Sequence, residues 1–234
     1  VEDARAALRA PAARGRVRVV RVLVRPVARG RDGTPTRLRA AQTGFSALAD
    51  RAMAPQTRAQ GLGLVVFHDR ARVVTSVTAA LRGFQAGVGD IEPRGETALW
   101  DAVVMAVGEL VAFRDAERSR DPAAAPCKLR VVALTDGRDT RSSASRAKAA
   151  AAALAARVTV DAILIGSPGT ELADVARLTG GDVYAPEDMG SLVSLCSSAD
   201  FVAAAEADRP AKLNADASLK DVDQWLRRHR RGAP

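Results

Sequence analysis

The chain has 234 residues, 47% of them hydrophobic, which suits one large α/β domain with a sizeable core. Its net charge of +8 comes mostly from scattered arginines, and only 3% of residues are aromatic, which argues against a nucleic-acid-binding surface. Two cysteines without CxxC spacing argue against a zinc site or disulfide framework, and no apolar run approaches the roughly 20 residues that cross a bilayer.

The first half of the chain alternates strand patterns with helical patterns. Residues 1–16 are an Ala- and Arg-rich lead-in, and the β-branched run from Val17 to Val24 predicts a strand. Gly30 to Pro35 is loop material, and a helix is predicted from Thr36. The apolar face of that helix comprises Leu38, Ala41, Phe45, Leu48 and Ala52. The next predicted elements are a strand at Gly63–Phe67, a paired strand at Arg72–Thr75 and a helix from about Thr78.

The second half repeats this alternation. Its most strand-like stretches are Leu129–Leu134 and Val158–Ile165, which are continuously apolar. The polar stretch from Arg114 to Pro126 predicts an exposed loop, and residues 206–234 predict a polar, basic tail. That tail contains one amphipathic piece formed by Leu219, Val222, Trp225 and Leu226. The other predicted elements are helices at Ala98–Phe113, Ser142–Arg157, Glu171–Thr179 and Met189–Ala205, and a short strand at Asp182–Ala185.

The order of these elements predicts the fold class. Strands that alternate with helices and lack a two-residue polar alternation indicate an α/β fold with a doubly wound, mostly parallel central sheet covered by helices on both faces. We divide the chain into an N-terminal lead-in (1–16), one domain (17–205) and a C-terminal tail (206–234).

Two polar residues stand where ligands gather in such a sheet. Asp136 directly follows a predicted strand, at the carboxyl edge of the sheet, and Thr97 lies on a loop that leads into a helix. Each also has a structural interpretation, because Thr97 could cap the helix and Asp136 could form a turn. Asp101 and Asp139 are expected to cap helices or to pair with arginines.

The motifs, in their order, resemble those of a von Willebrand factor A (VWA) domain, also called an integrin I-like domain, and are most similar to intracellular VWA domains. The resemblance covers roughly residues 17–205. The matching segments are Gly61–Phe67, Gly95–Ala102, Leu134–Thr140, Val160–Gly166 and Leu178–Gly181. The resemblance implies a protein-binding edge at which a divalent ion is held by an Asp-x-Ser-x-Ser loop, a Thr and an Asp.

This chain departs from that ligand set. Thr97 and Asp136 match the last two ligands, but the Asp-x-Ser-x-Ser positions fall on Arg25, Val27 and Arg29. Mg²⁺ takes about six oxygens, of which the chain supplies two here. The electrostatic repulsion between a guanidinium and a metal ion 4–8 Å away would cost roughly 2 to 4 kcal/mol for each unit of the ion's charge, at an effective dielectric of about 20. We therefore predict a degenerate metal site in which arginine replaces the cation.

The sequence thus predicts a non-enzymatic, intracellular, cytoplasmic protein-interaction module. The expected binding face is Arg25, Arg29, Thr97 and Asp136, which would engage an acidic side chain of a protein partner without a cofactor. The alternative is a metal-dependent adhesion domain in which weakly bound Mg²⁺ is completed by Asp32 or by the partner. A hydrolase that uses Asp136 is a third hypothesis, but no second carboxylate motif, Walker loop or nucleophile elbow supports it.

Overall fold

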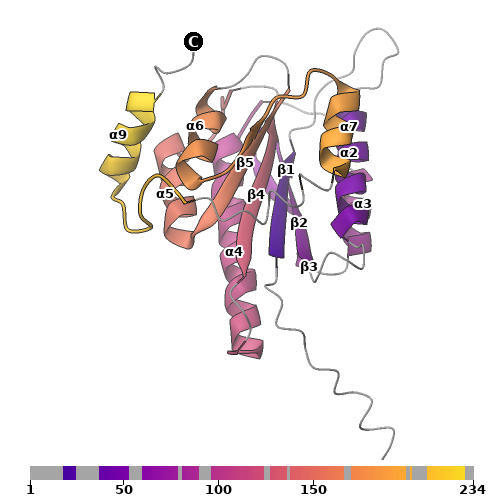
Figure 1. Ribbon diagram of the computed structural model, residues 1–234, viewed down its shortest axis with the longest axis horizontal. Helices are drawn as coiled ribbons and strands as arrows, with labels where there is room; N and C mark the ends of the chain where they lie inside the picture. Colours follow the sequence, from indigo (N-terminus) through magenta and orange to yellow (C-terminus); the bar gives the residue numbers. More distant parts are fainter. Residues whose placement is uncertain are drawn as a thin grey trace, which may run out of the picture.

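Six strands form one mixed sheet in the order β3-β2-β1-β4-β5-β6 (Figure 1). The computed structural model describes residues 18–24, 37–52, 60–78, 81–89, 96–123, 127–135, 138–165, 170–198, 201 and 210–229. The strands are β1 (Arg18–Val24), β2 (Gln60–Phe67), β3 (Ala71–Thr78), β4 (Lys128–Thr135), β5 (Val158–Leu164) and β6 (Val183–Tyr184). All neighbours pair in parallel except β3, which is antiparallel to β2. The predicted mostly parallel α/β sheet is confirmed.

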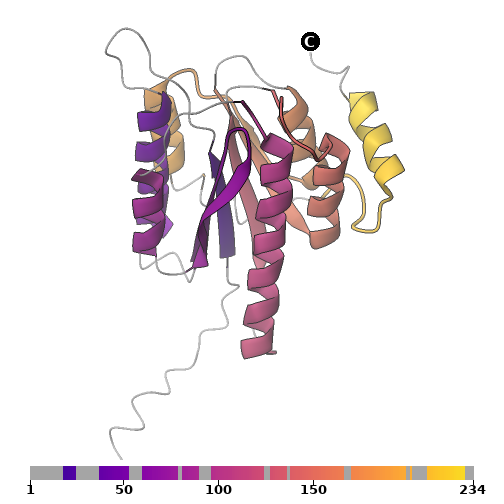
Figure 2. The same cartoon turned by 180° about the vertical axis from the view of Figure 1, so that it is seen from behind.

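Helices cover both faces of the sheet, as Figures 1 and 2 show from opposite sides. The helices are α2 (Arg37–Ala52), α3 (Leu81–Gly89), α4 (Leu99–Arg120), α5 (Arg146–Ala156), α6 (Thr170–Thr179), α7 (Met189–Ser197) and α9 (Leu219–His229). One face carries α2, α3 and α7, and the other carries α4, α5 and α6, with α9 packed on the outer side of α5 and α6. Successive side chains of β4 enter different cores, since Val131 and Ala133 pack on the α4 side while Val132 and Leu134 pack on the α2 side. A strand buried on both faces reads as a continuous apolar run for this reason.

Two predicted boundaries were wrong because polar residues can belong to helices as well as to loops. α4 continues to Arg120, through the first part of the stretch predicted as loop, since residues 114–120 include no Gly or Pro and Arg120 pairs with Glu117 (Nη1–Oε1 2.7 Å). Pro122 follows and ends the helix. α5 begins only at Arg146, because Ser145 caps it by accepting from the Lys148 N–H.

Smaller shifts affect two further helices. β3 extends to Thr78, so α3 begins at Leu81 and not at Thr78. α7 ends at Ser197, where the prediction extended this helix to Ala205; residue 201 is helical, and residues 202–209 lie outside the described residues. For α2 the predicted apolar face is confirmed at Ala41, Phe45 and Leu48, which are buried.

The C-terminal segment packs on the rest of the fold. The predicted amphipathic piece forms α9, and its Val222 and Leu226 are fully buried where α9 packs against the outer side of α5 and α6. Ahead of α9, the Lys212 N–H donates to the Leu178 carbonyl at the end of α6 (2.8 Å). The domain boundary that we predicted at residue 205 falls outside the described residues. In the part of the chain that the structure describes, no helix is both long and apolar enough to cross a membrane.

Candidate functional site

The candidate site lies where neighbouring parallel strands end. Val24, the last residue of β1, lies opposite Leu134 of β4 on one side and Val66 of β2 on the other. The carboxyl ends of these strands therefore share one edge, which is where ligands bind in open α/β sheets. Of the four predicted site residues, Thr97 belongs to the described part of the chain, whereas Arg25, Arg29 and Asp136 lie outside it.

Thr97 is held at this edge by its backbone. Its N–H donates to the Thr140 Oγ1 (3.0 Å), and its carbonyl accepts from the N–H groups of Thr140 (2.9 Å) and Arg141 (3.1 Å). The residue is 1% exposed. The interpretation of Thr97 as a helix cap was wrong, because Ala98 occupies the N-cap position of α4 and no side chain there makes the cap hydrogen bond. The side chain of Thr97 makes no hydrogen bond to any described residue.

The N–H groups of the first turn of α4, which have no partner within the helix, donate instead to a loop about forty residues away in the sequence. Asp139 accepts on Oδ1 from the N–H groups of Leu99 (2.8 Å) and Trp100 (3.4 Å). The Ser142 hydroxyl accepts from the N–H groups of Trp100 (2.9 Å) and Asp101 (3.1 Å), and donates to the Asp139 Oδ1 (2.5 Å). The predicted capping role of Asp139 is confirmed, and the carboxylate also complements the positive end of the α4 dipole.

Asp101 makes the reciprocal connection from α4 to the same loop. Its carboxylate accepts from the N–H groups of Ser143 (3.0 Å) and Ala144 (2.8 Å) and from the Ser143 hydroxyl (3.1 Å). Burial raises the pKa of Asp101, but these hydrogen bonds outweigh it and hold the pKa below its ordinary value. We call Asp101, Asp139, Ser142 and Ser143 the α4–α5 clasp, since together they tie the start of α4 to the loop before α5.

The turn between β2 and β3 closes the other side of the site. The Glu96 N–H donates to the Asp69 Oδ1 (2.7 Å), and the Ala98 N–H donates to the His68 carbonyl (2.8 Å). At the surface, the Arg141 Nε lies 3.4 Å from the Glu96 Oε2. The segment 96–98 is therefore fixed from both sides, and Thr97 is presented in a rigid frame.

Sequence reasoning missed Thr140, Ser142 and Asp69 as parts of this frame. A local signal existed for Ser142, because an acidic residue three positions before a serine is a frequent turn and cap pattern. For Thr140 and Asp69 the partners are distant in the sequence, so no local pattern would have identified them. Among the residues that the structure describes, no three His, Cys, Asp or Glu side chains gather in a way that could hold a metal ion.

Comparison with curated proteins gives one distant relationship. No protein-family profile matches the chain. The chain is 28% identical over 126 residues to a probable bifunctional E2/E3 enzyme, R795, of Acanthamoeba polyphaga mimivirus. The aligned part is 53% of this chain and spans 10% of the length of that protein.

Solved structures resemble the fold over most of the chain. One is the von Willebrand factor type A structure from Catenulispora acidiphila, with a TM-score of 0.56, 20% identity, and coverage of 78% of this chain and 41% of that one. Another is the VWA domain of SpRpn10, with a TM-score of 0.56, 16% identity, and coverage of 76% and 94%. These similarities agree with the observed strand order and with the position of Thr97 at the carboxyl edge of the sheet. The chain therefore has the fold of a von Willebrand factor A domain.

Proposed function

We propose that this chain is a non-enzymatic protein-interaction module whose binding face is Arg25, Arg29, Thr97 and Asp136, and that it binds its partner without a divalent metal. The VWA fold supports an interaction role, which the resemblance implied. The partner's contact is an acidic side chain, because a guanidinium recognises a carboxylate through two parallel hydrogen bonds.

The observation that carries this function is the set of oxygen donors at the edge. Three described carboxylates around the start of α4 accept hydrogen bonds from backbone N–H groups: Asp139 from α4, Asp101 from the loop before α5, and Asp69 from Glu96. Residues 25–31 contain no Asp, Glu, Ser or Thr. At the positions that the resemblance assigns to metal ligands, the oxygen donors are Thr97 and Asp136, too few for the roughly six oxygens that Mg²⁺ requires. The residues present therefore do not fit a dication.

A restoration experiment tests the metal independence. The wild-type chain and the triple variant Arg25→Asp, Val27→Ser, Arg29→Ser are titrated with Mn²⁺ and Mg²⁺ in a calorimeter. The variant rebuilds the Asp-x-Ser-x-Ser pattern beside Thr97 and Asp136, so it is expected to release saturable heat at submillimolar metal while the wild type does not. Saturation of the wild type in the same range would contradict metal independence.

A capture experiment tests the arginines. Partner recovery from lysate by the wild type is compared with recovery by Arg25→Ala plus Arg29→Ala, with and without EDTA. The matched control is Arg118→Ala plus Arg120→Ala, two exposed arginines at the far end of α4. We expect the site variant to lose the partner, and the control and EDTA to have no effect. Unchanged recovery by the site variant would rule out the arginine contact.

A metal-dependent VWA domain is the second candidate, and one observation favours it. The Thr97 side chain is buried and makes no hydrogen bond to the described residues, so its hydroxyl is available as a donor. Asp32 or the partner's carboxylate would then have to complete the shell. Capture that EDTA abolishes, and that the alanines at Arg25 and Arg29 leave unchanged, would favour this candidate.

The activity of the mimivirus protein is not transferred to this chain, which spans a tenth of that protein's length. The chain shows no nucleophile motif, and within the described residues Asp139 and Asp101 at the edge accept hydrogen bonds from backbone N–H groups.

An intracellular location remains part of our proposal. It is supported by two cysteines that are both free, one of them, Cys196, buried with its pKa raised by burial to about 12.

A further inference from the structure

The loop before α5 carries several hydroxyl groups beside the candidate site. Residues 138–145 belong to neither a helix nor a strand, and they lead from the edge at which Thr97 lies to the first turn of α5. Their backbone N–H groups hold the Thr97 carbonyl, and their side chains form part of the α4–α5 clasp. A chemical change in this loop would therefore act on the start of α4 and on the site together.

Hydrogen bonding distinguishes one hydroxyl of this loop from the others. The side-chain oxygens of Thr140, Ser142 and Ser145 each accept from backbone N–H groups. The Ser143 hydroxyl is exposed and donates to the two carboxylate oxygens of Asp101 (3.1 and 3.3 Å). No described residue donates to the Ser143 Oγ, so the lone pairs of this oxygen are open to an electrophile from solvent.

Exposed basic side chains flank Ser143 along the chain. Arg138 and Arg141 precede it by five and two positions, and Lys148 follows it by five. The Arg141 side chain is 62% exposed. An enzyme that binds this loop through acidic side chains would form charge-assisted hydrogen bonds with the two guanidinium groups. The loop therefore has the exposure, the irregular backbone and the charge of a substrate for an arginine-directed serine kinase.

We infer that Ser143 is a phosphorylation site for an arginine-directed kinase, and that its phosphate opens the Asp101 side of the α4–α5 clasp. In the transfer, the Ser143 Oγ forms a bond to the γ-phosphorus of ATP while the bond from that phosphorus to the bridging oxygen breaks. ADP leaves, and the hydroxyl proton passes to a base of the kinase. The phosphoserine carries about −1.5 to −2 charge at pH 7.

This charge conflicts with the contacts that Asp101 makes. Its carboxylate accepts from the Ser143 hydroxyl and from the N–H groups of Ser143 and Ala144. Phosphorylation removes the hydroxyl proton and places a second anion beside the carboxylate, which is repulsive. The other side of the clasp, where Asp139 accepts from Leu99, does not involve Ser143. The phosphate is therefore expected to loosen the Ser143 and Ala144 backbone first.

The loosened loop is also the one that supports Thr97. The N–H groups of Thr140 and Arg141 donate to the Thr97 carbonyl. We expect phosphorylation to weaken partner capture for this reason, a consequence that rests on the proposed function. The opening of the clasp itself is measured without any partner.

The first experiment locates the phosphate. The full chain is incubated with an arginine-directed serine kinase and Mg²⁺-ATP, and the modified residue is identified by mass spectrometry of its peptides. We expect phosphate at Ser143, its loss in Ser143→Ala, and no change in Ser119→Ala. Ser119 is the matched control, since it is an exposed serine between Arg118 and Arg120 but lies on helix α4. Absence of phosphate at Ser143, or phosphate at Ser142 or Ser145 in its place, overturns the assignment.

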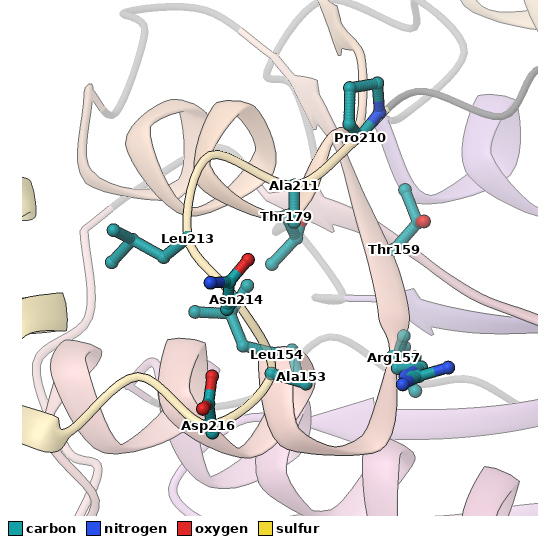
Figure 3. Close-up of a pocket in the computed structure, with 12 residues that line it drawn as sticks. Ala153, Leu154, Arg157, Thr159, Thr179, Pro210, Ala211, Leu213, Asn214 and Asp216 are labelled. Carbon is teal, nitrogen blue, oxygen red and sulfur yellow. The ribbon is translucent and has the colours of Figure 1, made fainter.

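The second experiment measures the opening by amide hydrogen exchange. Exchange at the Ser143 and Ala144 N–H groups is expected to become about tenfold faster or more in the phosphorylated chain, because each loses an ionised acceptor. The reference is the Lys212 N–H, which donates to the Leu178 carbonyl (2.8 Å). It belongs to the segment 210–216 at the other end of α5, drawn in Figure 3, and its exchange is expected not to change.

The variant Asp101→Asn separates the effect of charge from that of added bulk. Phosphorylation is expected to lower the urea midpoint of the wild type more than that of Asp101→Asn, because the variant has no carboxylate to repel the phosphate. Equal lowering in both chains, or unchanged exchange at Ser143 and Ala144, overturns the opening of the clasp. Neither readout involves a partner, so a failure here is distinct from a failure of the proposed function.

Discussion

Individual residues show where the packing of this fold leaves no freedom. A Cβ built on Gly181 would lie 1.9 Å from the backbone carbonyl oxygen of Val160, a contact that no side-chain movement can relieve. Gly181 lies just before β6, where the chain comes alongside β5. The close approach of the two backbones therefore requires glycine here, and not an unusual φ. Gly108, an exposed residue in the middle of α4, has nothing within 4 Å of the same added atom.

These two glycines predict opposite effects of one substitution. Gly181→Ala is expected to lower the free energy of unfolding by about 3 kcal/mol, the upper end of the cost of overpacking, because backbone must move. Gly108→Ala is expected to raise it by about 0.5 to 1 kcal/mol, because alanine loses less entropy in a helix. Urea denaturation followed by circular dichroism measures both. Equal effects at the two positions would show that the approach of Gly181 to β5 is looser than described.

A buried ion pair gives a second prediction at this scale. Arg130 on β4 and Asp161 on β5 are 7% and 1% exposed, and Asp161 also accepts from the Asp182 N–H (2.8 Å). Asp161→Ala is expected to cost about 3 to 5 kcal/mol, because it removes the carboxylate that bonds a buried guanidinium and leaves Arg130 with the more distant Asp182 (Nη2–Oδ2 3.8 Å). The double variant Arg130→Met, Asp161→Leu should recover most of that loss in thermal or urea denaturation. If the double variant is no more stable than the single one, the stranded charge is not the cause.

At the scale of elements, the α4–α5 clasp determines how the candidate site is supported. Asp139→Ala removes the acceptor for two N–H groups of α4, so it is expected to lower the free energy of unfolding by about 0.5 to 2 kcal/mol. Asp115→Ala is the control, since the Asp115 side chain is 57% exposed on α4 and, among the described residues, pairs with the adjacent Arg114. The control is expected to change stability by less than about 0.5 kcal/mol. Similar losses in urea denaturation would mean that the clasp contributes little.

The clasp also predicts a dependence on pH. Hydrogen bonds from the loop hold the pKa of Asp101 below its ordinary value of 3.8 in the folded chain. The resulting stabilisation is complete above the unfolded pKa and is lost as pH falls through the lower, folded pKa. The stability difference between the wild type and Asp101→Asn is therefore expected to shrink as pH falls below about 4. Denaturation midpoints at several pH values measure it, and a difference that stays constant would contradict this role of the carboxylate.

The elements also show what sequence could and could not predict. The strand predicted at Val158–Ile165 could be recognised because a strand buried on both faces is a continuous apolar run. The α2 face around Phe45 could be recognised because a helix buried on one face has apolar residues three and four positions apart. Polar stretches were ambiguous: Arg114–Arg120 is helix, and the serines before Arg146 form caps. At the site, the position of Thr97 at the sheet edge was predictable from strand order. The hydrogen bonds that fix this region were not predictable, because Thr140 reaches Thr97, and Asp139 reaches Leu99, only through the fold.

Considered as a whole molecule, the fold includes its C-terminal segment in the same body as the sheet. The candidate site lies at the carboxyl ends of β1 and β4, and residues 210–216 lie at the other edge, beside the amino end of β5. After this segment, α9 packs on α5 and α6. A segment with the composition of a tail is therefore an integral layer of the fold.

This integration predicts that α9 unfolds together with the sheet. Leu226 is fully buried, so Leu226→Ala is expected to lower the free energy of unfolding by about 2 to 5 kcal/mol, from lost apolar contact and the cavity left behind. Leu219, on the same helix, is 53% exposed, and Leu219→Ala is the matched control, expected to change stability by less than about 0.5 kcal/mol. Trp225 on α9 and Trp100 in the core should report one common transition in fluorescence, because a helix that shares the core cannot leave it without exposing Val222 and Leu226. Two separate transitions, or equal effects of the two leucine variants, would mean that α9 is an independent appendage.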